Sequence, residues 1–168
     1  LALGRVVMQA DLPVRLVVLV AAVENAISGD AFRPGDILNS RKGLTIEIGN
    51  TDAEGRLILA DVLTRAAEHS PDLTLDFATL TGAARIALGP ELPPLYSEDE
   101  ALVADLLEAS RAVADPLWPM PLWPGYRAAL DSEIADIRND SAAWAQARSI
   151  TAGLFLQRFP PHTGVWAH

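Results

Sequence analysis

The sequence predicts an α/β fold, a three-layer sandwich in which helices cover a mostly parallel, mixed sheet. Two apolar segments carry this prediction. Residues 14–22 form a nearly continuous β-branched run, which is typical of a strand buried on both faces of a parallel sheet. Residues 72–78 follow a Ser-Pro pair and begin with alternating polar and apolar side chains. One helical pattern separates the two segments, and others follow the second. The 168 residues, 50% of them hydrophobic, are enough to bury the core of one domain.

The other elements follow from periodicity and turn residues. We expect a helix over residues 1–10, a loop over 24–36, a hairpin of strands 37–39 and 44–48, and a helix after residue 54. Ser97 and Glu100 have the spacing of a capping box, which predicts a helix beginning there. Four prolines in residues 115–125 exclude regular structure from that ordered loop. Further helices are expected over residues 126–137 and 147–155.

Composition and charge exclude several classes of function. The net charge is −9, and the 13 basic residues form no cluster, so we expect no nucleic-acid partner. The absence of cysteine excludes disulfides, thiolate metal sites and a cysteine nucleophile. The apolar run at residues 14–23 is shorter than the roughly 20 residues that span a bilayer, so no membrane partner is expected. We expect a cytoplasmic protein.

The clearest chemical pattern is Asn-Thr-Asp-Ala-Glu-Gly-Arg-Leu at residues 50–57. If this stretch is extended, Asp52, Glu54 and Arg56 lie on one face, because side chains alternate along a strand. Paired carboxylates suit hard divalent cations, and an arginine beside them can hold an anion or a developing oxyanion. The alternative is structural: Thr51 and Glu54 also have capping-box spacing, and Glu54 would then only stabilise a helix N-terminus.

Other titratable residues are weaker candidates. The histidines at positions 69, 162 and 168 lie far apart and form no His-x-His pair, so we expect no histidine metal site. Asp36, Asp61 and Asp76 are expected to serve as caps, solvated charges or structural partners.

Residues 50–57 resemble the signature of the leucyl aminopeptidase family, the M17 or cytosol aminopeptidase family of dinuclear metallopeptidases. Other segments resemble the same catalytic domain in the same order along the chain. They are residues 24–25, 28–29, 33–36, 78–83, 88–89, 131–132 with 135–136, 150–152 with 155–156, and 166–168.

The resemblance implies roles for matching residues. Asp52 and Glu54 would bind two divalent ions, Mn or Zn, with Glu54 bridging them, and Arg56 would lie beside bicarbonate or the tetrahedral intermediate. The residues expected to contact substrate are Asn50, Thr79, Gly82 and, through its backbone carbonyl, Leu80. The reaction implied is release of N-terminal amino acids from peptides by a metal-activated water, in a homo-oligomer that is hexameric in the family.

The same resemblance implies that residues 1–168 are a partial C-terminal catalytic domain. The upstream part of that domain, which supplies further lysine and aspartate residues, and the N-terminal domain are absent from this sequence. Lys42, the only lysine, does not match either family lysine, and Arg148 replaces a usual glycine. We therefore expect an incomplete metal site and an inactive segment from an active parent. The alternative is a degenerate or truncated α/β module that serves assembly or binding.

Overall fold

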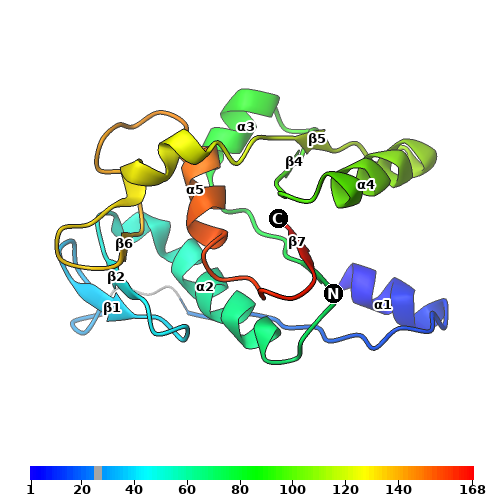
Figure 1. The fold of residues 1–168 in the computed structure, drawn as a ribbon, viewed down its shortest axis with the longest axis horizontal. Helices are drawn as coiled ribbons and strands as arrows, with labels where there is room; N and C mark the ends of the chain where they lie inside the picture. Colours follow the sequence, from blue (N-terminus) through cyan, green and yellow to red (C-terminus); the bar gives the residue numbers. More distant parts are fainter. Residues whose placement is uncertain (25–27) are drawn as a thin grey trace.

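The computed structural model describes residues 1–24 and 28–168. Figure 1 shows the three-stranded sheet at the left end of the molecule and α1 and α4 at the right end, with α2 and α5 between them. The elements, in chain order, are α1 (Ala2–Gln9), β1 (Ile37–Asn39), β2 (Thr45–Glu47), the 3-10 helix η1 (Thr51–Ala53), α2 (Glu54–Ala67), β3 (Leu73–Leu75), α3 (Gly82–Leu88), β4 (Pro94–Leu95), α4 (Glu100–Val113), β5 (Trp118–Pro119), the 3-10 helix η2 (Pro124–Leu130), β6 (Ile137–Arg138), α5 (Arg148–Leu156) and β7 (Val165–Ala167).

The strands belong to three small sheets. Strand β2 pairs antiparallel with β1, as the predicted hairpin requires, and parallel with β6, so that Ile46 lies opposite Ile137. Strands β3 and β7 form a parallel pair, and so do β4 and β5. The predicted α/β class with mostly parallel strands is therefore confirmed.

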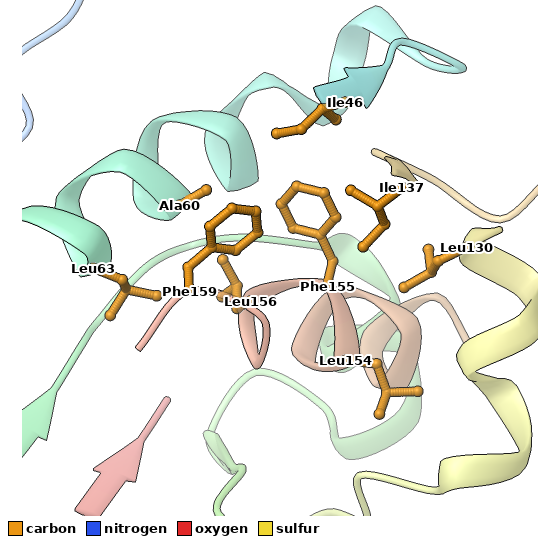
Figure 2. Packing of buried hydrophobic residues seen from close by; sticks show 9 residues of the cluster. All are labelled: Ile46, Ala60, Leu63, Leu130, Ile137, Leu154, Phe155, Leu156 and Phe159. Atoms are coloured by element: carbon orange, nitrogen blue, oxygen red, sulfur yellow. The ribbon is translucent and has the colours of Figure 1, made fainter. Parts of the chain in front are cut away.

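The core lies where α5 packs against α2 and against strands β2 and β6. Phe155 and Phe159 are fully buried, and their rings pack 5.2 Å apart. Figure 2 shows the Phe155 ring directed toward Ile46 and Ile137, with Ala60 of α2 beside Phe159. Burial of each such side chain contributes about 1.5–3 kcal/mol, so this cluster holds α2 and α5 against the strands that precede the Asn50–Arg56 motif.

The prediction of a buried strand at residues 14–22 is wrong for this structure. These residues form no strand and are exposed; Val18, for example, retains 46% of its accessible surface. A strand needs hydrogen bonds from neighbours, and none of the described strands pairs with this segment. The segment touches α1, where a Cβ built on Gly4 would lie 3.0 Å from Val18, and Arg15 donates to the His69 carbonyl at 2.5 Å.

Helices α1, α2, α4 and α5 confirm the local predictions for their segments. The helix expected over residues 126–137 is wrong, because the 3-10 helix η2 ends at Leu130 and Ile137 begins β6. The segment 115–125 is also not wholly irregular, since it contains the short strand β5. The cap of α4 differs, because Asp99 accepts the hydrogen bond from the amide of Leu102, and Ser97 instead accepts from Asp99. Within the predicted loop at residues 24–36, residues 25–27 lie outside the described part of the chain. None of the described helices is both long and apolar enough to cross a membrane.

Candidate active site

The Asn50–Arg56 motif lies at the junction between β2 and α2, but it is not extended. Residues Thr51–Ala53 form the 3-10 helix η1, and Glu54 begins α2. Positions two apart on a helix point in different directions. The expectation that Asp52, Glu54 and Arg56 share one face of an extended segment is therefore wrong, and the three residues lie around a helix start.

The structural alternative for the motif is wrong in one detail as well. The capping residue is Asn50, whose side-chain oxygen accepts a hydrogen bond from the Asp52 amide at 2.9 Å. No side-chain cap closes the start of α2, so Thr51 and Glu54 do not form a capping box. Glu54 does lie in the first turn of α2, where a negative charge is stabilised by the helix dipole.

The two carboxylates remain available as ligands. Asp52 is exposed and Glu54 half-buried. Across residues 1–24 and 28–168, no ion pair engages either side chain. In the same part of the chain, no third aspartate, glutamate or histidine joins them in a group able to hold a metal ion. The donor atoms therefore suit a hard divalent cation, but the described residues supply only two of the ligands that such an ion needs.

Arg56 is a buried cation. It is 7% exposed, its Nη1 donates to the backbone oxygen of Asn139 at 2.7 Å, and its Nε has no hydrogen-bond partner among the described residues. Burial lowers the pKa of Arg56 to about 10, although Asp140 opposes this and Arg148 adds to it. A buried guanidinium with an unused donor is well suited to bind an anion, because an anion would offset the cost of burying the charge.

Asn139 holds the motif in place, and sequence reasoning missed it. Its side chain is 0% exposed and uses its full hydrogen-bonding capacity on the loop. Oδ1 accepts from the amides of Gly49 at 2.9 Å and Asn50 at 3.2 Å, while Nδ2 donates to the carbonyls of Asn50 at 2.7 Å and Ala53 at 3.4 Å. Together with the bond from Arg56 to its backbone, Asn139 touches the loop on both sides of Asp52.

The position of Asn139 directly after a strand is the feature of the sequence that could have indicated its role. That strand, β6, pairs parallel with β2, and the Asn139 amide donates to the backbone oxygen of Glu47 at 3.0 Å. The carboxyl ends of neighbouring parallel strands lie side by side. Pairing of residues 46–47 with 137–138 therefore brings Asn139 beside Gly49. The sequence alone does not determine which strands pair.

A cavity of about 490 Å³ lies around the start of α3. Its lining includes the predicted substrate-contacting residues Thr79, Leu80 and Gly82, at the start of α3. On the motif side, a Cβ built on Gly55 would lie 3.7 Å from Leu80 Cδ1. The structure therefore brings the residue 79–82 segment into contact with the first turn of α2, as an active site composed of both would require.

A second set of residues, which the sequence did not reveal as a group, reaches this cavity through Tyr96 and His168. Asp76 accepts hydrogen bonds from Trp166 Nε1 at 2.7 Å and pairs with His168 Nδ1 at 2.5 Å. Tyr96 stacks on the His168 ring with centroids 6.0 Å apart, and both residues line the cavity. The expectation that Asp76 is a structural partner is confirmed, and parallel pairing of β3 with β7 brings its partners to it.

The chain was compared with known families, curated proteins and solved structures. The model of the cytosol aminopeptidase family, catalytic domain, matches residues 1–168. A probable cytosol aminopeptidase of Xanthomonas oryzae pv. oryzae is 51% identical over 160 residues, which are 95% of this chain and 32% of that protein. One from Xylella fastidiosa is 50% identical over 157 residues, 94% of this chain and 31% of that protein.

Solved structures agree with this result. The crystal structure of cytosol aminopeptidase from Coxiella burnetii superposes with a TM-score of 0.94 and 52% identity, covering 99% of this chain and 36% of that one. A mutant leucine aminopeptidase from tomato gives a TM-score of 0.84 and 40% identity over 88% of this chain and 29% of that one. The chain thus spans about a third of the length of its relatives. With its full length matched by the family model, the chain belongs to the cytosol aminopeptidase family, as a portion of the catalytic domain.

Proposed function

We propose that this chain contributes metal ligands, an anion-binding arginine and a substrate pocket to a metal-dependent aminopeptidase that releases N-terminal residues from peptides. The observation that carries the proposal, within a family member, is that the residue 79–82 segment, which lines a cavity, touches Gly55 in the first turn of α2, the turn that contains Glu54. The complete activity is assigned to the full-length polypeptide, because the chain spans only 32% of its curated relatives.

In this proposal Asp52 and Glu54 would hold divalent ions, manganese or zinc. Their oxygen donors and their lack of described ion-pair partners fit this role, and the remaining ligands would come from polypeptide outside these residues. Two such metal ions, when bound, would make a water acidic enough to attack near neutral pH and would polarise the scissile carbonyl.

Arg56 supplies a positive charge that is already oriented before substrate binds. Its Nη1 is tied to Asn139, and its guanidinium carbon lies 6.0 Å from the centre of the Phe155 ring, so the side chain is held from two sides. The guanidinium would bind bicarbonate or the oxyanion of the tetrahedral intermediate. A fixed donor of this kind stabilises developing charge without the cost of reorientation.

The cavity receives the substrate. Thr79 and Gly82 would line the space for the N-terminal side chain, and the Leu80 carbonyl would accept a hydrogen bond from the peptide. Asn50, whose side chain caps η1, would also contact the substrate. Gly82 is suited to a pocket wall, since a Cβ at this position would meet no atom within 4 Å and its absence leaves space.

The cellular setting and assembly belong to the same proposal. We place the full-length protein in the cytoplasm, as the names of its curated relatives imply, and expect a homo-oligomer of the hexameric kind.

The test is hydrolysis of leucine amides by the full-length polypeptide carrying Asp52→Asn or Glu54→Gln. Loss of a metal ligand should lower kcat by about 100-fold or more and weaken manganese binding, because each ion loses an oxygen donor. Matched controls are Asp105→Asn and Glu108→Gln, exposed carboxylates of α4, which should leave both properties unchanged. Full activity in both site variants would refute the proposal.

A non-catalytic function is the second candidate. It is favoured by the finding that the described residues contain no group of three potential metal ligands. In that case the fold would serve assembly or binding, and the full-length polypeptide would bind neither manganese nor zinc in calorimetric titration. Stoichiometric binding that Asp52→Asn abolishes would exclude this candidate.

A further inference from the structure

We propose that Asn139 is a positioning residue that sets the geometry of the metal-binding turn by clamping the backbone on both sides of Asp52. This inference rests on the proposed function, because it assigns to Asn139 the task of holding ligands for the metal ions. Asn139 does not touch substrate or metal in this role and acts through the turn.

The hydrogen bonds carry the first step of the argument. The Asn139 side-chain oxygen accepts hydrogen bonds from the backbone N–H groups of Gly49 and Asn50. Its side-chain nitrogen donates to the backbone carbonyls of Asn50 and Ala53. A carboxamide has two donor hydrogens and one acceptor oxygen, so every group is used. Because the donors meet carbonyls and the acceptor meets amides, reversing the amide would break all of these contacts.

The position of these bonds carries the second step. Gly49 and Asn50 precede Asp52, and Ala53 separates Asp52 from Glu54. The clamp therefore fixes the chain before the first carboxylate and between the two. The turn itself contributes one side-chain bond, from the Asp52 amide to Asn50. Without Asn139, the Gly49 and Asn50 amides would lose the acceptor that the structure gives them, and the Asn50 carbonyl would keep only the Ala53 amide at 3.3 Å, beside a position that is fully buried.

Close packing carries the third step. The backbone of Gly49 approaches the β6 extension so closely that a Cβ there would lie 2.2 Å from Asp140 Oδ1 and 2.5 Å from Arg138 Nη2. Asn139 thus lies between Arg138 and Asp140, whose side chains pack closely against Gly49. The backbone oxygen of Asn139 also binds Arg56, so one residue sets the spacing between the carboxylates and the buried cation.

The side chain and the backbone of Asn139 can be separated by mutation. Asn139→Leu removes all four side-chain bonds but keeps the backbone carbonyl that anchors Arg56. Asn139→Asp keeps an acceptor for Gly49 and Asn50 and removes both donations to carbonyls. The matched control is Thr151→Val in α5, where a side chain that is 1% exposed loses its one bond, to the Arg148 carbonyl at 3.2 Å.

The experiment combines three measurements on the full-length polypeptide: manganese affinity by calorimetry, kcat and KM for a leucine amide, and hydrogen exchange of the Gly49 and Asn50 amides. For Asn139→Leu we expect exchange of both amides to accelerate about tenfold. Manganese affinity and kcat should fall by about 10- to 100-fold, the usual effect of losing a group that orients metal ligands, with little change in KM. Thr151→Val should change none of these, even if it lowers the melting temperature.

Asn139→Asp distinguishes the two halves of the clamp and provides a second variant if Asn139→Leu does not fold. It should retain amide protection at Gly49 and Asn50 and have manganese affinity between those of the unsubstituted protein and Asn139→Leu. The inference is overturned if Asn139→Leu loosens both amides yet keeps manganese affinity and kcat within about twofold, or if the amides remain protected. Failure of the proposed function has a different signature: manganese would bind equally well after Asp52→Asn.

Discussion

Arg56 offers a test in which stability and activity should move in opposite directions. The change is Arg56→Met, which retains an unbranched apolar side chain and removes the charge. Burial lowers the Arg56 pKa from its ordinary value to about 10, with Asp140 raising it and Arg148 lowering it. At about 1.4 kcal/mol for each tenfold change in proton affinity, the charged form costs about 3 kcal/mol in the folded state.

The variant also loses a favourable contact. The bond from Arg56 Nη1 to the Asn139 carbonyl, which the variant lacks, contributes about 1.5–3 kcal/mol because its donor is charged. The difference predicts that Arg56→Met raises the free energy of unfolding of the 168-residue chain by up to about 1.5 kcal/mol. The sign also follows from linkage between protonation and folding. At pH values between the lowered pKa of Arg56 and its ordinary pKa, the unfolded chain binds more protons than the folded chain, so stability rises with pH. This rise should disappear in the variant.

The assay is equilibrium urea denaturation near neutral pH, with the midpoints compared at unchanged slope. The control is Arg138→Met, because Arg138 pairs with Glu47 and their side chains are 22% and 12% exposed. Removing that partner should destabilise the chain by about 1–3 kcal/mol. In the full-length polypeptide, Arg56→Met should lower kcat by about 100-fold or more. A lower urea midpoint for Arg56→Met would refute the reasoning, since the guanidinium would then stabilise the fold.

Two further predictions concern the same region. Gly49→Ala should destabilise the chain by about 1–3 kcal/mol in urea denaturation, because its Cβ would overlap Asp140. The control Gly29→Ala meets no atom within 4 Å and should have a small effect; equal midpoints for both would contradict the steric argument. Hydrogen bonds from the Thr45 hydroxyl and amide lower the pKa of Asp136, so its stabilisation is present above the ordinary aspartate pKa and is lost as pH falls through the lowered value. Asp136→Asn should flatten this acid limb of a pH–stability curve, and an unchanged limb would contradict the assignment.

Local patterns were sufficient for elements whose stabilisation is local. The helix α2 follows from apolar spacing, and the β1–β2 hairpin follows from turn residues between two short apolar segments. The run at residues 14–22 was predicted from composition alone, and it is exposed because a strand depends on partners that its own sequence does not specify. Its β-branched residues indicate a preference for extended backbone, and none of the described strands completes a sheet with them.

For the candidate site, the residue types in Asn50–Leu57 were enough to indicate carboxylate ligands, a neighbouring cation and a family. They did not determine the geometry. Asp52 lies in a 3-10 turn and not on an extended segment, because Asn50 caps that turn and Asn139 binds its backbone. The sequence by itself therefore determined which chemical groups are present and the family to which they belong. Only the tertiary structure decided that Arg56 is buried, that Leu80 lies beside Gly55, and that Asn139 organises the loop. The physical reason is that these contacts join segments about 25 to 90 positions apart, and such contacts depend on strand pairing and core packing, which no local pattern encodes.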